Sequence, residues 1–171
     1  MKPFREISEA FDKPLEFDID LWPEHNTLMY WFKLSDKDYY RVIIGPTDDE
    51  DESGHDHEVR FSHFKNYSKI HDPESLGKTN VLAALTTANT IKVFATVIAT
   101  IKEHFESFPG LESFSFRSDP SERSRVKLYN KLAIMAARKL NWHAYTYSKD
   151  GYVMFVITKH RDNDSDKTPL K

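Results

Sequence analysis

The clearest pattern of apolar and polar positions lies in the middle of the chain, over residues 85–141. In its first part, apolar residues recur at spacings of three and four, which predicts a helix with one buried stripe. The stripe consists of Ile91, Phe94, Ile98, Ile101 and Phe105. Thr87 or Asn89 is expected to cap the start of this helix, and Pro109-Gly110 is expected to end it.

A short strand and a second helix are predicted next. Residues 112–116 alternate between polar and apolar and are too few for a helix. The second helix should open at Pro120, with Asp119 or Ser121 as its cap. Its predicted inner face consists of Val126, Tyr129, Leu132, Ala133, Ala136 and Leu140.

Alternating or aromatic-rich segments on both sides of this stretch predict strands. They are residues 28–34, 39–45, 58–64, 142–147 and 152–158, with turns at 35–38 and 148–151. Residues 80–85 fit a buried strand or an early helical turn, and residues 6–11 fit a short helix. We therefore expect an α/β (α+β) fold of order β-β-β-(β)-α-β-α-β-β, in which helices flank a mixed, mostly antiparallel sheet. Pairing should be parallel where a helix joins two strands.

The length, composition and charge of the chain exclude several kinds of site and partner. The 171 residues suit a single domain over residues 1–160, followed by a polar tail at 161–171. The absence of cysteine excludes disulfides, thiolate metal sites and a catalytic thiol. A net charge of −3 gives no electrostatic reason to expect nucleic acid as a partner. No apolar run is long enough to span a bilayer and the first residues lack the apolar core of a signal peptide, so we expect a cytoplasmic protein without a membrane partner.

The order of elements over residues 80–158, the Leu128-Tyr129 pair and the closing aromatic hairpin resemble the second half of the GNAT superfamily of acetyl-CoA-dependent N-acyltransferases. The chain also resembles small bacteriophage proteins of this type. In the family, a glycine-rich loop between a strand and a helix holds the pyrophosphate of the cofactor on backbone amides. The residues in the matching place are Thr86, Thr87, Ala88, Asn89, Thr90 and Ile91, and none of them is glycine.

The family's later helix carries a Tyr that acts as a general acid toward the departing thiolate. Tyr129 matches this Tyr, and Leu128 and Lys131 match its neighbours, whereas Glu122 and Arg125 stand where the family prefers Asn and Ala. The resemblance further implies Glu58 or His63 as a general base that acts on the amine through water. Arg125 belongs to a basic cluster that could meet a phosphorylated adenosine moiety or an acidic partner. The cluster consists of Arg117, Arg123, Arg125 and Lys127.

Each of these features also has a structural interpretation. The amides at the start of the first helix can bind an anion, but every capped helix has such amides. Tyr129 can be a proton donor or a core aromatic residue on the inner face of its helix. The histidines near the acidic loop at 46–58 could suggest a metal site, but we expect a solvated loop and no metal. This set consists of His55, His57, His63 and His71, with Asp56 and Glu58.

Two functional hypotheses follow from the resemblance. The first is a GNAT-like acyltransferase that transfers an acetyl group from acetyl-CoA to an amine substrate. Acetyl-CoA would lie against the start of the first helix, between the preceding strand and residues 112–116. The alternative is a catalytically degenerate GNAT-fold phage protein that binds and modulates a host protein in the host cytoplasm. A structural virion component is a third possibility.

Overall fold

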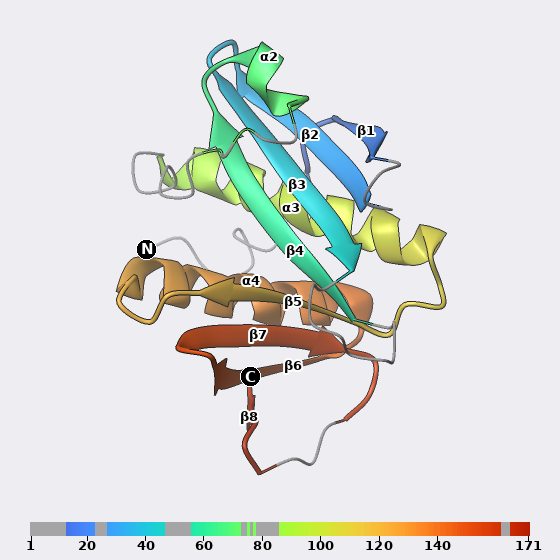
Figure 1. Cartoon of the computed structure of the whole chain (residues 1–171), viewed down its shortest axis with the longest axis vertical. Helices are drawn as coiled ribbons and strands as arrows, with labels where there is room; N and C mark the ends of the chain where they lie inside the picture. Colours follow the sequence, from blue (N-terminus) through green and yellow to red (C-terminus); the bar gives the residue numbers. More distant parts are fainter. Residues whose placement is uncertain are drawn as a thin grey trace. The chain divides into compact units, whose positions relative to one another are not determined.

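The structure is a computed structural model that describes residues 13–22, 27–46, 56–72, 75, 77, 86–161 and 165–171 (Figure 1). Its strands are β1 (Phe17–Trp22), β2 (Thr27–Ser35), β3 (Asp38–Pro46), β4 (Asp56–Phe64), β5 (Ser113–Ser118), β6 (His143–Lys149), β7 (Tyr152–Thr158) and β8 (Thr168–Pro169). Its helices are α2 (Tyr67–Ile70), α3 (Thr87–Ser107) and α4 (Arg123–Leu140).

The chain divides into two compact units, and each is described by itself. The first unit comprises Met1–Ile43 and Arg60–Thr100, and the second comprises Ile44–Val59 and Ile101–Lys171. Strands β3 and β4 and helix α3 contribute residues to both units.

The strands are hydrogen-bonded in the order β1-β2-β3-β4-β5-β7-β6-β8. Strands β4 and β5, which α3 connects, pair in parallel, whereas β5 with β7, β7 with β6, and β6 with β8 pair antiparallel. The predicted α+β class with a mixed, mostly antiparallel sheet is therefore confirmed, and the sheet is open. Parallel pairing across a helical connection is confirmed for α3, but β7 separates the two strands that α4 connects.

In the first unit, α3 covers one face of the strands. Phe94 of α3 contacts Phe61 of β4 edge-on, with 6.4 Å between ring centroids, and the Leu15 amide donates to Thr96 Oγ1 at 2.9 Å. Of the predicted stripe on this helix, Phe94, Ile98, Ile101 and Phe105 are buried and Ile91 is half-buried. The 3.6-residue period therefore identified the face that packs.

Helix α2 and the segment after it are held by Arg41 of β3. The Arg41 guanidinium donates to the carbonyl oxygens of Ile70, Asp72 and Ser75 at 3.1, 2.8 and 2.6 Å. It also lies over the Phe64 ring, 4.6 Å from the centroid. Arg41 is only 3% exposed, and burial lowers the pKa of its guanidinium. One buried cation thus replaces the backbone partners that this irregular segment lacks.

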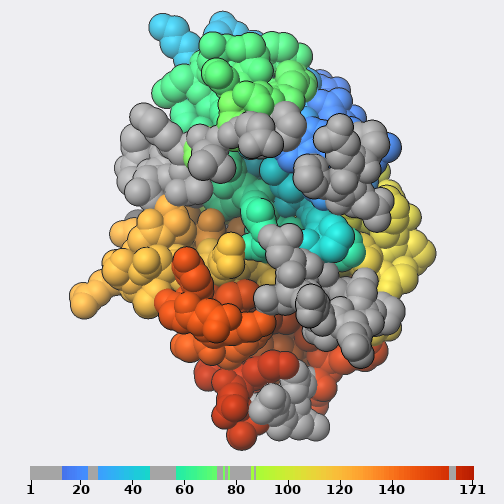
Figure 2. All heavy atoms as spheres, viewed as in Figure 1, coloured from blue at the N-terminus to red at the C-terminus, as the bar shows by residue number. Residues whose placement is uncertain are grey.

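The edge of the first unit exposes apolar side chains. Ile19 and Leu21 of β1 are 48% and 60% exposed, and Tyr67 of α2 is 48% exposed. Figure 2 shows the blue atoms of β1 and the green atoms of α2 on the surface. Asp18 and Asp20 alternate with these residues along β1, and charges on an edge strand disfavour pairing with another chain.

In the second unit, α4 packs against β5, β6 and β7 (Figure 1). The core contains stacked and tilted aromatic rings, including Phe116 stacked on Phe155 at 5.8 Å and Phe105 tilted against Phe114 at 4.9 Å between centroids. Of the predicted inner face of α4, Tyr129, Leu132, Ala133 and Ala136 are buried. The other two, Val126 and Leu140, are half-buried.

The two ends of α4 are capped differently, and the cap at its start is not the one predicted. Glu122 occupies the cap position without a side-chain hydrogen bond, while Asp119 accepts from the amide and hydroxyl of Ser121 in the preceding turn. Asp119 and Ser121 were therefore wrong as caps, because their side chains satisfy each other. At the far end, Asn141 adopts a left-handed conformation with φ 57° and ψ 43°, and Trp142 N–H donates to Ala137 O at 2.8 Å.

The other differences from the prediction concern short segments. Strand β4 begins at Asp56, inside the predicted loop at 46–58. Strand β1 and helix α2 were not predicted, and the predicted polar tail contains β8, whose Thr168 and Pro169 pair with Thr146 and Tyr145. Strand β1 pairs with β2, β8 pairs with β6 and α2 is held by Arg41 of β3, and the periodicity of a segment does not reveal such contacts with other segments. The predictions for residues 6–11 and 80–85 lie outside the described residues.

Candidate functional site

The predicted cofactor loop forms the start of α3, and Thr86 caps it. The Asn89 amide donates to Thr86 Oγ1 at 3.3 Å, and the Thr90 amide donates to the Thr86 carbonyl at 2.9 Å. Thr90 Oγ1 donates to the same carbonyl at 3.0 Å. The cap is thus Thr86, directly before the helix, and the predicted caps Thr87 and Asn89 are wrong.

This capping limits what the helix start can offer an anion. The Asn89 and Thr90 amides are engaged within the chain, so the amides of Thr87 and Ala88 are the ones that a helix leaves without an internal acceptor. Ala88 is exposed, while Asn89, Thr90 and Ile91 are half-buried. The first turn carries no acidic residue that would repel an anion. The residues therefore fit a phosphate group in part, through two amides rather than a glycine-rich cradle.

The predicted base Glu58 lies in the second unit, where β4 meets β5. It stands opposite Ser115 in the parallel register, and its Oε1 lies 3.4 Å from Nε of Arg117. The Arg117 guanidinium also lies over the ring of Tyr152, 5.1 Å from the centroid. The Glu58 side chain is 12% exposed and that of Arg117 is 51% exposed. Glu58 is therefore ion-paired at the edge of solvent.

The predicted acid Tyr129 is a core residue of the second unit. It is 7% exposed and contacts Phe116 and Phe155 edge-on, with ring centroids 5.3 and 6.0 Å away. Burial is the largest cause of the shift and raises the pKa of Tyr129 to about 12. The charge of Arg125 opposes this shift, and the charge of Glu122 adds to it, each with a smaller effect than burial. The hydroxyl is therefore protonated at neutral pH and is suited to donate a proton rather than to accept one.

Glu58 and Tyr129 lie on opposite faces of the sheet. Arg117 pairs with Glu58, whereas its neighbour Phe116 contacts Tyr129. Successive side chains of a strand point to opposite faces, so the two contacts are on different sides of β5. The structure thus does not bring the two predicted catalytic side chains onto one face.

Arg125, the predicted phosphate ligand, forms an ion pair with Glu122 at the start of α4. Its side chain is 17% exposed, and its charge lowers the pKa of Tyr129. Arg125 and Tyr129 are therefore brought together in the second unit. The loop residues Thr86–Ile91 belong to the first unit.

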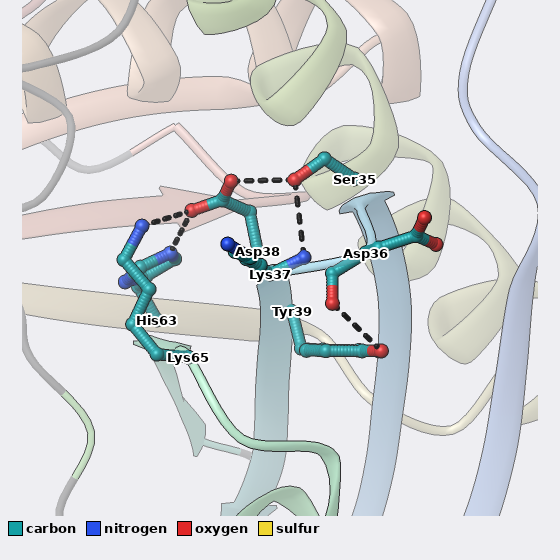
Figure 3. Close-up of polar contacts among 7 residues, drawn as sticks. All are labelled: Ser35, Asp36, Lys37, Asp38, Tyr39, His63 and Lys65. Carbon is teal, nitrogen blue, oxygen red and sulfur yellow. Dashed lines mark hydrogen bonds and ion pairs between the residues drawn. The ribbon is translucent and has the colours of Figure 1, made fainter.

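A polar cluster that the sequence did not predict lies at the start of β3 (Figure 3). Oδ1 of Asp38 contacts His63 Nε2 at 2.8 Å and Lys65 Nζ at 2.7 Å, and its Oδ2 accepts from Ser35 Oγ at 2.5 Å. These partners hold the pKa of the Asp38 carboxyl well below its usual range, with Lys65 and Ser35 as the largest favourable causes. His63, which the resemblance offered as a second candidate base, is therefore held by a carboxylate and is only 3% exposed.

The aromatic residue beside this cluster is Tyr40. Its ring centroid lies 4.9 Å from that of His63, and burial raises the pKa of Tyr40 to about 12. Within the part of the chain that the structure describes, Tyr40 Oη and His63 Nδ1 are buried without a hydrogen-bond partner. No local spacing connects residues 38, 40 and 63, so no sequence pattern predicts this arrangement. The geometry is that of a partly buried structural cluster that links the start of β3 to the end of β4.

The histidines that could suggest a metal site are dispersed. His57 lies 5.8 Å from His104 between ring centroids, His63 contacts Asp38, and His71 Nδ1 lies 3.0 Å from Asp20 Oδ2. Over the described ranges, no group of three or more His, Asp or Glu side chains could hold a metal ion. His55 lies outside these ranges.

Among the helices of the described residues, none is long and apolar enough to cross a membrane. A scan against protein-family models, a search of curated proteins and a search of solved structures found no match to this chain.

Proposed function

We propose that the protein is a GNAT-like acyltransferase that binds acetyl-CoA and transfers the acetyl group to an amine. The observation that carries this proposal is the short parallel pairing of β4 with β5. The register covers three residue pairs, from Asp56–Ser113 to Glu58–Ser115, whereas β5 continues to Ser118.

This register leaves an edge on β5. Backbone groups of residues 116–118 that face away from β7 lie beyond the β4 ladder. An extended molecule with amide groups can hydrogen-bond to such an edge as an added strand does. The pantetheine arm of coenzyme A is extended and contains amides, so it suits this edge. In the first unit, taken by itself, the start of α3 suits an anionic group such as a phosphate, because its first turn carries no acidic residue.

The chemistry needs one proton donor and one acceptor. The amine nitrogen would attack the thioester carbonyl, the carbon–sulfur bond would break, and the thiolate would take the Tyr129 hydroxyl proton. The nitrogen would lose its proton to solvent water, because Glu58 lies on the opposite face of the sheet from Tyr129. Because its pKa is raised to about 12, the Tyr129 hydroxyl is protonated at neutral pH and is a weaker acid than an exposed tyrosine.

The first test is calorimetric titration with acetyl-CoA. Native protein should bind at micromolar concentration, and an Asn89→Asp/Thr90→Glu variant should lose at least about tenfold in affinity because it places negative charge beside the phosphates. Acidic residues near a helix start stabilise the helix, so lost binding would not reflect unfolding. Asn89→Gln/Thr90→Gln is the neutral control and should bind as the native chain does. Absence of heat at millimolar ligand would overturn the proposal.

Transfer is tested separately from binding. With a panel of small amines and acetyl-CoA, release of free thiol should require Tyr129. A Tyr129→Phe variant should lower kcat by about tenfold to a hundredfold while leaving the Kd for acetyl-CoA unchanged, since it removes only the proton donor. An unchanged kcat would remove Tyr129 from the mechanism.

A second candidate function is a catalytically degenerate protein of the same fold that binds and modulates a host protein. The opposite-face placement of Glu58 and Tyr129 and the ion pair of Glu58 with Arg117 favour it. This candidate is supported if the native chain gives neither acetyl-CoA heat nor thiol release and retains one bacterial protein from lysate that an Arg117→Glu variant releases. Release of thiol by the native chain would exclude it.

A further inference from the structure

A cavity of about 520 Å³ lies in the second unit, between the end of α4, the start of β6 and the C-terminal segment. This volume is in the range of sites that hold small organic molecules. The residues around it belong neither to the cofactor loop nor to the Glu58 and Tyr129 sites.

One part of the cavity wall is apolar and aromatic. Ile134, Trp142 and Leu170 contribute to it from α4, the following turn and the C-terminal segment. The Trp142 ring is held by two neighbours, because Phe105 packs edge-on against it with 5.1 Å between ring centroids and Lys159 Nζ lies over it, 5.4 Å from its centroid. The part of this half-buried indole that lines the cavity offers apolar surface to a ring or chain.

The other part of the wall is cationic. Arg138, Arg161 and Lys171 line the cavity from three separate segments, and among the described residues that line it no side chain is acidic. All three are exposed, so their charged groups can reach a ligand at the mouth without a large desolvation cost. Guanidinium and ammonium groups recognise carboxylate, phosphate and sulfonate oxygens through charge-assisted hydrogen bonds.

Backbone hydrogen bonds hold these walls in place. Leu170 N–H donates to Ala144 O at 2.8 Å, which ties the C-terminal segment to β6 beyond the β8 pairing. The carbonyls at the end of α4 would repel an anion, but Ala137 O accepts from the amides of Asn141 and Trp142, and Arg138 O accepts from Asn141. The negative end of the helix is therefore largely satisfied within the chain.

We propose that this cavity is a binding site for a small organic anion that has an apolar ring or chain and one carboxylate, phosphate or sulfonate group. The apolar body would lie against Trp142, and the anionic group would lie between Arg161 and Lys171. The site is independent of acyl transfer and stands whether or not the protein binds acetyl-CoA.

Anilinonaphthalene sulfonate is a suitable probe, because its fluorescence rises in an apolar site and its sulfonate supplies the charge. The native chain should bind one equivalent, and Arg161→Gln and Lys171→Gln should each weaken binding by about fivefold to tenfold. Affinity should fall as salt is added. Lys131→Gln changes an exposed charge on α4 outside the cavity and should leave the affinity unchanged.

Neutral N-phenylnaphthylamine serves as the matched uncharged probe and should bind at least about tenfold more weakly than the sulfonate. Near-ultraviolet circular dichroism of each variant verifies that the fold is intact. Three results would each overturn the proposal: no binding of the sulfonate, equal binding of the neutral probe, or equal losses in Lys131→Gln and the two cavity variants.

Discussion

Two charged side chains, buried Arg41 and half-buried Asp38, each make three hydrogen bonds or ion pairs within the chain. Arg41 binds three carbonyls of the segment after α2, and Asp38 accepts from three side chains. Each of these hydrogen bonds contributes only modestly to the net stability of the fold. Removal of the charged group costs more, because its buried partners are then left without a hydrogen bond. They are the residues at which single substitutions should have large effects.

Replacement of Arg41 by Met should destabilise the chain by about 3 kcal/mol, because the carbonyls of Ile70, Asp72 and Ser75 lose their shared donor. Arg41→Lys should restore only part of this stability, since one ammonium cannot reproduce the planar fork. Urea denaturation measures both values. The role assigned to Arg41 is wrong if the Met variant is as stable as the native chain.

Asp38 should make the free energy of unfolding fall at low pH. Its carboxyl has a lowered pKa in the folded state, so its contribution is complete above the unfolded pKa of about 3.9 and is lost as pH falls through the lower folded value. The difference in unfolding free energy between native protein and Asp38→Asn should therefore be larger at pH 7 than at pH 3. Asp36→Asn, in the same turn but with a 91% exposed side chain, is the control and should show little effect at either pH.

His104 should make the stability of the fold depend on pH in a range less acidic than that of Asp38. Burial, with a smaller contribution from His57, lowers the pKa of His104 to about 4, so the folded state resists protonation that the unfolded chain accepts below about 6.5. Its contribution to stability is complete above pH 6.5 and is lost as pH falls toward 4, and the loss at pH 5 is about 2 kcal/mol. His104→Leu should remove this part of the pH dependence. His160→Gln, at a 67% exposed side chain, should retain it.

At the level of helices and strands, turn geometry decides which glycines are required. The β6–β7 turn places Asp150 at φ 50° and Gly151 at φ 80°, the left-handed region that suits a two-residue hairpin. A Cβ added at Gly151 would meet no atom within 4 Å, so any cost of a side chain there comes from the backbone alone. Gly110 is equally open but has no positive φ.

Gly151→Ala should therefore destabilise the chain by about 1 kcal/mol, since only the left-handed conformation is affected. Gly110→Ala should be neutral or slightly stabilising, because it restricts the unfolded chain without strain. Thermal unfolding of the two variants provides the comparison. Equal melting temperatures would show that the turn relaxes around the new side chain.

The contrast between predicted and unpredicted elements has a physical basis. The α3 and α4 stripes and the β6–β7 hairpin follow from periodicity and turn residues that are close in sequence. The Thr86 cap was missed because Thr87 and Asn89 have equally suitable side chains, and only the backbone path selects among them. Strand β8 was missed because its pairing with β6, rather than its own composition, stabilises it.

The candidate site was less predictable than the fold. A Tyr at position 129 fits the inner face of a helix and a catalytic pattern equally well, and the contacts with Phe116 and Phe155 reveal its burial. The Asp38–His63 contact joins residues that are 25 positions apart, and no local pattern encodes it. The ion pair of Glu58 with Arg117 likewise depends on the parallel register of β4 and β5.

For the molecule as a whole, the important feature is continuity through the two units. Strands β3 and β4 and helix α3 each pass from one unit into the other. Because neither unit can unfold without breaking these shared elements, we expect one cooperative transition.

The tryptophans provide the test, since Trp22 and Trp31 belong to the first unit and Trp142 to the second. A variant that retains only Trp142, with Phe at the other two positions, reports on the second unit, and the converse Trp142→Phe variant reports on the first. In each variant, the fluorescence and far-ultraviolet circular dichroism transitions in urea should coincide. Two separated transitions would contradict cooperativity.

The position of β7 has a consequence for how the chain is made. β7 is encoded after β6 but lies between β5 and β6, paired with six residues of one and seven of the other. During translation both neighbours therefore leave the ribosome before the strand that joins them. Until Thr158 has emerged, each has an open hydrogen-bonding edge with apolar residues beside it, which is the condition under which nascent chains pair wrongly or recruit chaperones.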